Sequence, residues 1–232
     1  MDDAKRKAIY EAQCANVRAL LAARKQIKTN INEALRTRKD HQAETLTKTL
    51  AVVFTAWVEA SFSKLLHTPD GFDLAQIAAV KTVSSKNVVQ GWEKCIDVAI
   101  QEHDADASGF DQSDRQRLQT AVADLIKSPS ELRNKIAHGQ WVRALNGKNT
   151  DVNQAATEDI SELSVVKLDM WFDCQTKLSV IVEHLIVSPN KAFIKTYRKL
   201  MDELEDMFRK RSSWTLEAKR SRLRQKRTVY NS

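Results

Sequence analysis

Apolar residues recur at intervals of three and four along most of the chain, which is the pattern of helices that bury one face. The longest such segments predict helices at residues 5–36, 41–67, 158–187 and 190–210. Shorter helices are expected at 73–80, 85–102 and 112–127, and a last one after Ser212 and Ser213, which can cap it. The stretch 51–58 is apolar nearly all round and is expected at the centre of the bundle.

Residues that break helices are scarce, with five Gly and three Pro in 232 residues. Strand-rich folds need more frequent turns, so we predict an all-α bundle with loops at 103–111 and 146–157. The run Ser128-Pro129-Ser130-Glu131 has the form of a capping box with Ser128 as N-cap. A helix is therefore expected to start there, and Gly139 can end it.

The formal net charge of +7 is spread unevenly. Nine basic residues and one acidic residue lie between positions 209 and 230, which leaves the rest of the chain close to neutral. Clustered cations suit a polyanion such as RNA, because they release its counterions, although a solvated helical tail is an equal alternative. We predict a helical domain at 1–208 and a basic extension at 209–232, with Arg220, Arg222 and Arg224 as candidate RNA contacts.

The cysteines, Cys14, Cys95 and Cys174, are odd in number and show no CxxC spacing, which is typical of a reducing compartment. The first residues lack a signal-peptide pattern, and no stretch is expected to approach transmembrane length. We therefore expect a cytoplasmic protein that does not use a membrane.

An Arg followed five residues later by His occurs twice, at Arg36 and His41 and at Arg133 and His138. The spacing alone decides nothing, but Asn134 follows the second Arg, and Gly139 follows the second His. Residues 132–139 resemble the R-N-x-x-x-H signature of the HEPN superfamily. Its members are helical bundles, and many are metal-independent ribonucleases of toxin–antitoxin, abortive-infection and CRISPR-associated systems.

The chemistry of these residue types agrees with that resemblance. A histidine can act as base or acid near neutral pH, and an arginine can hold a phosphate. Asn134 and His138 are neighbours on one helix face, so the amide could orient the imidazole, whereas Arg133 lies about 140° away on an ideal helix. One chain thus provides one imidazole, and the resemblance implies a homodimer whose two motifs, Arg133 and His138 of each copy, form one composite site.

The resemblance also implies an endoribonuclease without cofactors that attacks RNA through its 2′-hydroxyl, acts as a toxin or antiphage effector, and has an antitoxin or defence-system partner. Three alternatives stay open. The chain could be a catalytically silent module for dimerisation or for binding nucleotides or RNA. His138 could be a structural imidazolium at a helix C-terminus, or the motif could be accidental in a helical scaffold.

Glu59 is the only acidic residue between positions 51 and 66, so it is expected to be buried with a partner, either Arg133 or another cation. Lys135, Trp141 and Arg143 are candidate RNA contacts beside the motif, although a core position is the commoner fate of a Trp. The other histidines show no metal-ligand spacing, and the chain has no Gly-rich phosphate loop. These absences argue against metallohydrolase and NTPase classes.

Overall fold

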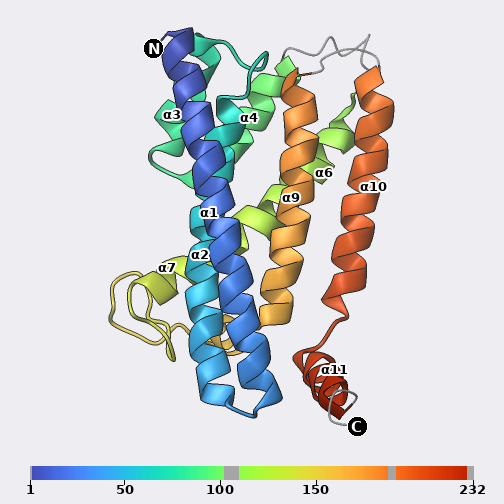
Figure 1. The fold of residues 1–232 in the computed structure, drawn as a ribbon. Helices are drawn as coiled ribbons and strands as arrows, with labels where there is room; N and C mark the ends of the chain where they lie inside the picture. Colours follow the sequence, from blue (N-terminus) through green and yellow to red (C-terminus); the bar gives the residue numbers. More distant parts are fainter. Residues whose placement is uncertain (1, 102–109, 188–191, 229–232) are drawn as a thin grey trace.

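The computed structural model describes residues 2–101, 110–187 and 192–228, and over these residues the protein is all-helical, as the sequence predicts. Four long helices run side by side along the molecule (Figure 1): α1 (Asp3–Arg36), α2 (Asp40–Leu66), α9 (Val165–Val187) and α10 (Ala192–Ser212). The predicted loop at 103–111 lies, apart from its last two residues, outside the described part.

Shorter helices cover one end and one side of these four. Near one end lie α3 (Leu74–Ser84) and α4 (Val88–Gln101) (Figure 1). A continuous helical stretch then passes behind α9 and consists of α6 (Gln112–Val122), a π-helical turn (Ala123–Lys127) and α7 (Ser128–Ala137). The last elements are α8 (Gln154–Ser161), which precedes α9, and α11 (Leu216–Thr228) at the far end.

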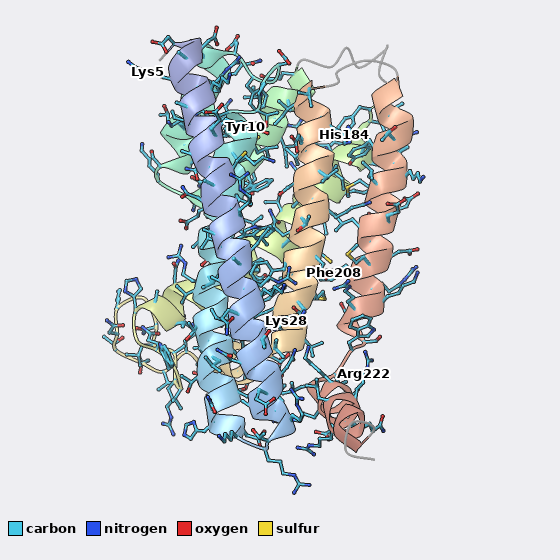
Figure 2. The ribbon with its side chains drawn as sticks, in the orientation of Figure 1. Lys5, Tyr10, Lys28, His184, Phe208 and Arg222 are labelled. Carbon is cyan, nitrogen blue, oxygen red and sulfur yellow. The ribbon has the colours of Figure 1, made fainter. Side chains whose placement is uncertain are left out.

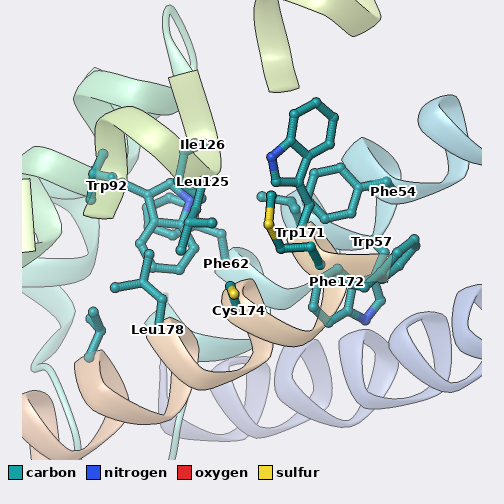
Figure 3. Close-up of a cluster of buried hydrophobic side chains, with 14 of the residues drawn as sticks. Phe54, Trp57, Phe62, Trp92, Leu125, Ile126, Trp171, Phe172, Cys174 and Leu178 are labelled. Carbon is teal, nitrogen blue, oxygen red and sulfur yellow. The ribbon is translucent and has the colours of Figure 1, made fainter. Parts of the chain in front are cut away.

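Aromatic side chains of α2 and α9 form the centre of the core (Figure 3). The ring of Phe54 lies edge-on to Phe172 at 4.8 Å and stacks on Trp171 at 5.9 Å, and Trp57 lies 5.1 Å from Phe172. Such ring pairs add stabilisation beyond that of the buried area. The apolar stretch at 51–58 is therefore central, as predicted.

From the sequence, no stretch is expected to approach transmembrane length. The α2 helix differs from this expectation, because its length and composition alone would allow it to cross a membrane. No other helix in the described residues of this length passes that test. More than half of its apolar window is buried inside the protein, against neighbours that include α1, α7 and α9. Its hydropathy is accounted for by its central place in the bundle.

The predicted capping box at Ser128 is wrong. Lys127 and Ser128 have helical backbone angles, and no side chain caps the start of α7. The chain instead accommodates Pro129 with the π-helical turn before it, where the Ser128 N–H donates to the carbonyl of Ala123. A proline lacks an N–H and its ring crowds the carbonyl four residues earlier, so a wider turn lets the helix continue.

Two other helix starts differ from the prediction because their capping residues were missed. The helix expected at 158–187 is interrupted at 162–164, and α9 starts after Ser164, whose hydroxyl accepts from the Lys167 N–H at 3.2 Å. The last helix is capped by Thr215, which accepts from the Ala218 N–H at 3.2 Å, and not by Ser212 or Ser213. The predicted domain boundary at 208/209 falls inside α10.

Candidate functional site

The end of α7 is built by its own sequence. Gly139 has a φ of +79°, which suits glycine, and its N–H donates to the Ile136 carbonyl at 3.1 Å. The Gln140 N–H donates to the Lys135 carbonyl at 2.9 Å, so the two bonds form a Schellman motif. The helix thus ends at His138, as the sequence predicts.

Arg133 is held by an ion pair with Glu59 of α2, with 2.6 Å between the guanidinium Nη2 and the carboxylate Oε1. The predicted pairing is therefore present, but its premise is wrong, because the Glu59 side chain is 52% exposed. The Nε of Arg133 is buried and has no hydrogen-bond partner among the described residues. The ion pair fixes the direction of the guanidinium while solvent still reaches the carboxylate.

Asn134 and His138 are both exposed on the surface of α7. Within the described residues no hydrogen bond joins the Asn134 amide to the imidazole, and the two residues are linked only through the backbone, from His138 N–H to Asn134 O at 3.1 Å. His138 is the C-cap of α7, with φ −88° and ψ 18°. Its imidazole is accessible to a ligand or to a second protein surface.

The candidate contacts beside the motif have different environments. Lys135 donates through Nζ to the Leu145 carbonyl at 2.5 Å, which ties α7 to the following loop. Trp141 donates through its indole N–H to the Ile136 carbonyl at 2.9 Å, and the Lys48 ammonium lies 5.9 Å from its ring centre. Trp141 keeps one exposed face at the surface, and Arg143 is exposed without an ion pair among the described residues.

The candidate contacts in α11 lie at another place, with α1 and α2 between α11 and α7 in Figure 1. Arg220 forms ion pairs with Asp40 at 2.9 Å and Glu217 at 3.6 Å. Arg224 is half-buried, and its Nε has no partner among the described residues, whereas Arg222 is exposed. The basic extension is therefore partly neutralised by the body of the protein.

Asp169 of α9 is the anion that anchors α11. It pairs with Lys28 at 2.8 Å, Arg24 at 3.2 Å and Lys219 of α11 at 3.5 Å. Burial acts to raise the pKa of Asp169. The hydrogen bond and charge of Lys28, the charge of Lys219 and the hydrogen bond from Arg24 outweigh burial and hold this pKa below its ordinary value. Lys28 of α1 and Arg222 of α11, both labelled in Figure 2, line the same small cavity, which α9 also borders through Asp169.

A groove of about 780 Å³ lies between α2, the turn from α3 to α4, and α7. Arg133 and Asn134 lie on its wall together with Glu59, whereas His138 lies beyond it. Sequence reasoning missed its other polar residues, among them His67, Lys81 and Lys86. The sequence signal for them is weak, because a single histidine without metal-ligand spacing and lysines that flank an ordinary polar turn mark no site.

Comparison of the chain with protein-family models, curated proteins and solved structures finds no match. Among the described residues, no three His, Cys, Asp or Glu side chains are grouped as metal ligands would be. The three cysteines are free, and Cys95 and Cys174 are buried. Burial raises the pKa of the Cys174 thiol to about 11. A buried thiol of this kind is inert at neutral pH.

Proposed function

We propose that the protein is a metal-independent endoribonuclease whose reacting groups lie at the end of α7. The observation that carries the proposal is the contrast between Arg133, directed by its ion pair with Glu59, and the exposed imidazole of His138 five residues later. A fixed cation and an accessible base are two of the groups that cleavage of RNA without a metal requires. The resemblance to HEPN ribonucleases supports the same assignment.

In the proposed reaction, His138 removes the proton from a ribose 2′-hydroxyl, whose oxygen attacks the adjacent phosphorus. The bond to the 5′-oxygen breaks, and that oxygen takes a proton from a general acid. Arg133 stabilises the charge on the phosphate oxygens, because a guanidinium matches two of them at once. The products are a 2′,3′-cyclic phosphate and a free 5′-hydroxyl.

The general acid comes from a second copy of the chain in this proposal. One protomer has one exposed imidazole at this site, and the Asn134 amide is not bound to it. Two motifs facing each other would provide a base and an acid together with two guanidinium groups. The associated cellular role is that of a toxin or antiphage effector, with an antitoxin or defence-system protein as its partner.

The deciding experiment is incubation of the purified protein with total RNA in the presence of EDTA. We expect cleavage by the wild type, loss of at least about a hundredfold in His138→Ala, and a 2′,3′-cyclic phosphate at the new ends. His41→Ala is the matched control, because His41 is exposed and follows Arg36 at the same spacing. Cleavage that His138→Ala retains, or that EDTA abolishes, would overturn the proposal.

Dilution tests the second copy. Specific activity should fall as the protein is diluted, in parallel with the dimer fraction measured by analytical ultracentrifugation. Cleavage by a protein that remains monomeric would contradict the composite site. RNA binding by the wild type without any cleavage would favour the alternative of a catalytically silent module.

A further inference from the structure

The groove beside Arg133 is larger than one phosphate needs. Its volume of about 780 Å³ lies in the range of small-molecule sites. One wall is the C-terminal half of α2, the opposite wall is the turn between α3 and α4, and α7 borders it with Arg133 and Asn134. The groove therefore extends from Arg133 and Asn134 on α7 towards the C-terminal end of α2.

Cations without partners line this groove. Lys81 and Lys86 stand on either side of the turn from α3 to α4, and Lys127 lies at the start of α7. In the described part of the chain none of the three forms an ion pair, whereas Arg133 on the same wall pairs with Glu59. Glu59, Glu93 and Glu131 also border the groove, and Lys81 and Lys86 provide its cations beside the α3–α4 turn.

His67 adds an unsatisfied acceptor to the same wall. The residue is 1% exposed, and its Nδ1 lies 2.6 Å from the carbonyl oxygen of Ser63. A carbonyl can only accept, so Nδ1 carries the proton and the neutral ring has its lone pair at Nε2. That nitrogen is buried and has no hydrogen-bond partner in the described residues. A ligand that donates a hydroxyl proton to it would relieve the cost of an unpaired acceptor.

Lys81 is close enough to His67 for its charge to act on the imidazole. The acceptor of His67 and the cation of Lys81 thus lie near each other in the groove, and Lys86 follows Lys81 across the α3–α4 turn. An anionic group for the lysines and a hydroxyl for His67 belong together in a phosphorylated ribose, which carries both within a few ångströms.

We propose that the groove between α2, the α3–α4 turn and α7 binds a ribose phosphate, with the phosphate at Lys81 and Lys86 and a ribose hydroxyl donating to Nε2 of His67. This inference rests on the proposed function for its favoured source, which is the segment of RNA next to the scissile phosphate. Asn134 on the groove wall and His138 are four residues apart, or about 6 Å along the helix axis. A strand lying in the groove can therefore reach the imidazole within one or two nucleotides.

The test is a binding measurement that needs no cleavage. Fluorescence anisotropy follows a short oligoribonucleotide whose 2′-hydroxyl at a single candidate scissile position is replaced by 2′-O-methyl, alongside the matching oligodeoxyribonucleotide and free AMP. Lys81→Ala/Lys86→Ala should weaken oligoribonucleotide binding at least about tenfold and lower the slope of log affinity against log salt by about 1 for each lysine.

The charge-matched control is Lys25→Ala/Lys199→Ala, which removes two exposed lysines of α1 and α10 that do not border the groove. Equal weakening in both double variants, or none in Lys81→Ala/Lys86→Ala, would overturn the proposal. Binding of AMP that depends on the same lysines identifies a free nucleotide as the source, whereas binding of the oligonucleotide alone identifies RNA.

His67→Phe tests the hydroxyl contact. The wild type should bind the oligoribonucleotide more tightly than the oligodeoxyribonucleotide, and His67→Phe should lose this difference. Equal binding of RNA and DNA by the wild type would contradict the role of Nε2. If His67→Phe does not fold, the Lys81→Ala/Lys86→Ala variant, which changes exposed positions, still tests whether the groove binds RNA. His138→Ala should lose cleavage but retain binding. A failure of the proposed reaction can therefore be distinguished from a failure of the groove to bind the oligoribonucleotide.

Discussion

At the scale of single residues, the three motif positions on α7 have different surroundings. Arg133 is directed by Glu59, which is 74 residues away in sequence, whereas Asn134 and His138 face outwards. The guanidinium is thus positioned by another helix, and the imidazole by the end of its own helix. Their separate supports allow each one to be tested with a different substitution.

Glu59→Gln should lower RNA cleavage less than Arg133→Ala does, because Glu59 orients the guanidinium without contacting the substrate. The free energy of unfolding should change by no more than about 1 kcal/mol, since the ion pair is half exposed. Urea denaturation and a cleavage assay measure the two effects. Glu44→Gln is the control, because Glu44 is likewise an exposed carboxylate of α2 in an ion pair, in its case with Lys48. A loss equal to that of Arg133→Ala would make Glu59 a reacting group.

His67 should make the stability of the protein depend on pH. Burial lowers the pKa of its imidazole below the ordinary value of about 6.5, the bond to Ser63 opposes this, and the charges of Lys81 and Arg6 reinforce it. The unfolded chain therefore binds the proton first as the pH falls. The stability that depends on neutral His67 is fully present above about pH 7. It is lost as the pH falls below about 6.5 towards the lowered pKa of His67.

Urea unfolding at pH 7, 6 and 5 measures this effect. His67→Phe should show a shallower decrease of the unfolding free energy than the wild type, and His41→Phe, at an exposed position, should leave the decrease unchanged. Parallel decreases in all three proteins would show that His67 does not contribute.

At the scale of elements, the helix ends decide what is presented at the surface. The Schellman motif at Gly139 ends α7 with His138 as its C-cap, and the π-helical turn before Pro129 sets the direction in which α7 leaves α6. Both features act on the same ten-residue helix, one at each end. Only the first is written in local sequence.

Gly139→Ala should lower the free energy of unfolding by about 1 kcal/mol, because alanine is strained at a φ of +79°. Apart from its own chain neighbours, no heavy atom lies within 4 Å of the position that the new Cβ would take, so the cost comes from the backbone conformation. Gly147→Ala is the control, since that site is equally open but has no positive φ. Equal stability of the two variants in chemical denaturation would disprove this account of the helix end.

At the scale of the whole molecule, α11 completes the fold more than it extends it. Leu216 and Leu223 pack against the core, and Asp169 binds cations of both α1 and α11. The basic C-terminal segment is thus joined to the bundle by apolar contacts and by an anion that is only 14% exposed. Arg222 remains directed to solvent and available to a polyanion.

Asp169→Asn should release α11 and lower the unfolding free energy by roughly 2 kcal/mol, because it removes the anion that pairs with Lys28 and Lys219 and leaves Arg24 with Asp173 alone. In the wild type this contribution is present above the ordinary carboxyl pKa of about 3.9 and is lost as the pH falls below it. Faster trypsin cleavage within 216–228 and a lower Tm measure the effect. Asp206→Asn, which removes an exposed i,i+3 pair, should change neither; an unchanged Asp169→Asn would refute the anchor.

The sequence by itself determined the helical class, the approximate extent of the long helices, the end of α7 at Gly139 and the motif at residues 133–138. These features follow from apolar periodicity and from the backbone preferences of single residues, which act over a few positions. The missed starts at Ser164 and Thr215 were also local, since both are ordinary capping residues.

Only the tertiary structure decided the passage of the helix through Pro129, the exposure of Glu59 beside Arg133, the docking of α11 on Asp169, and the groove with His67 and Lys81. Each depends on side chains that are far apart in sequence, and no local pattern reports their distance. Arg133 and His138 were recognisable from Asn134 and Gly139 beside them, but the surfaces to which they belong come from helix packing.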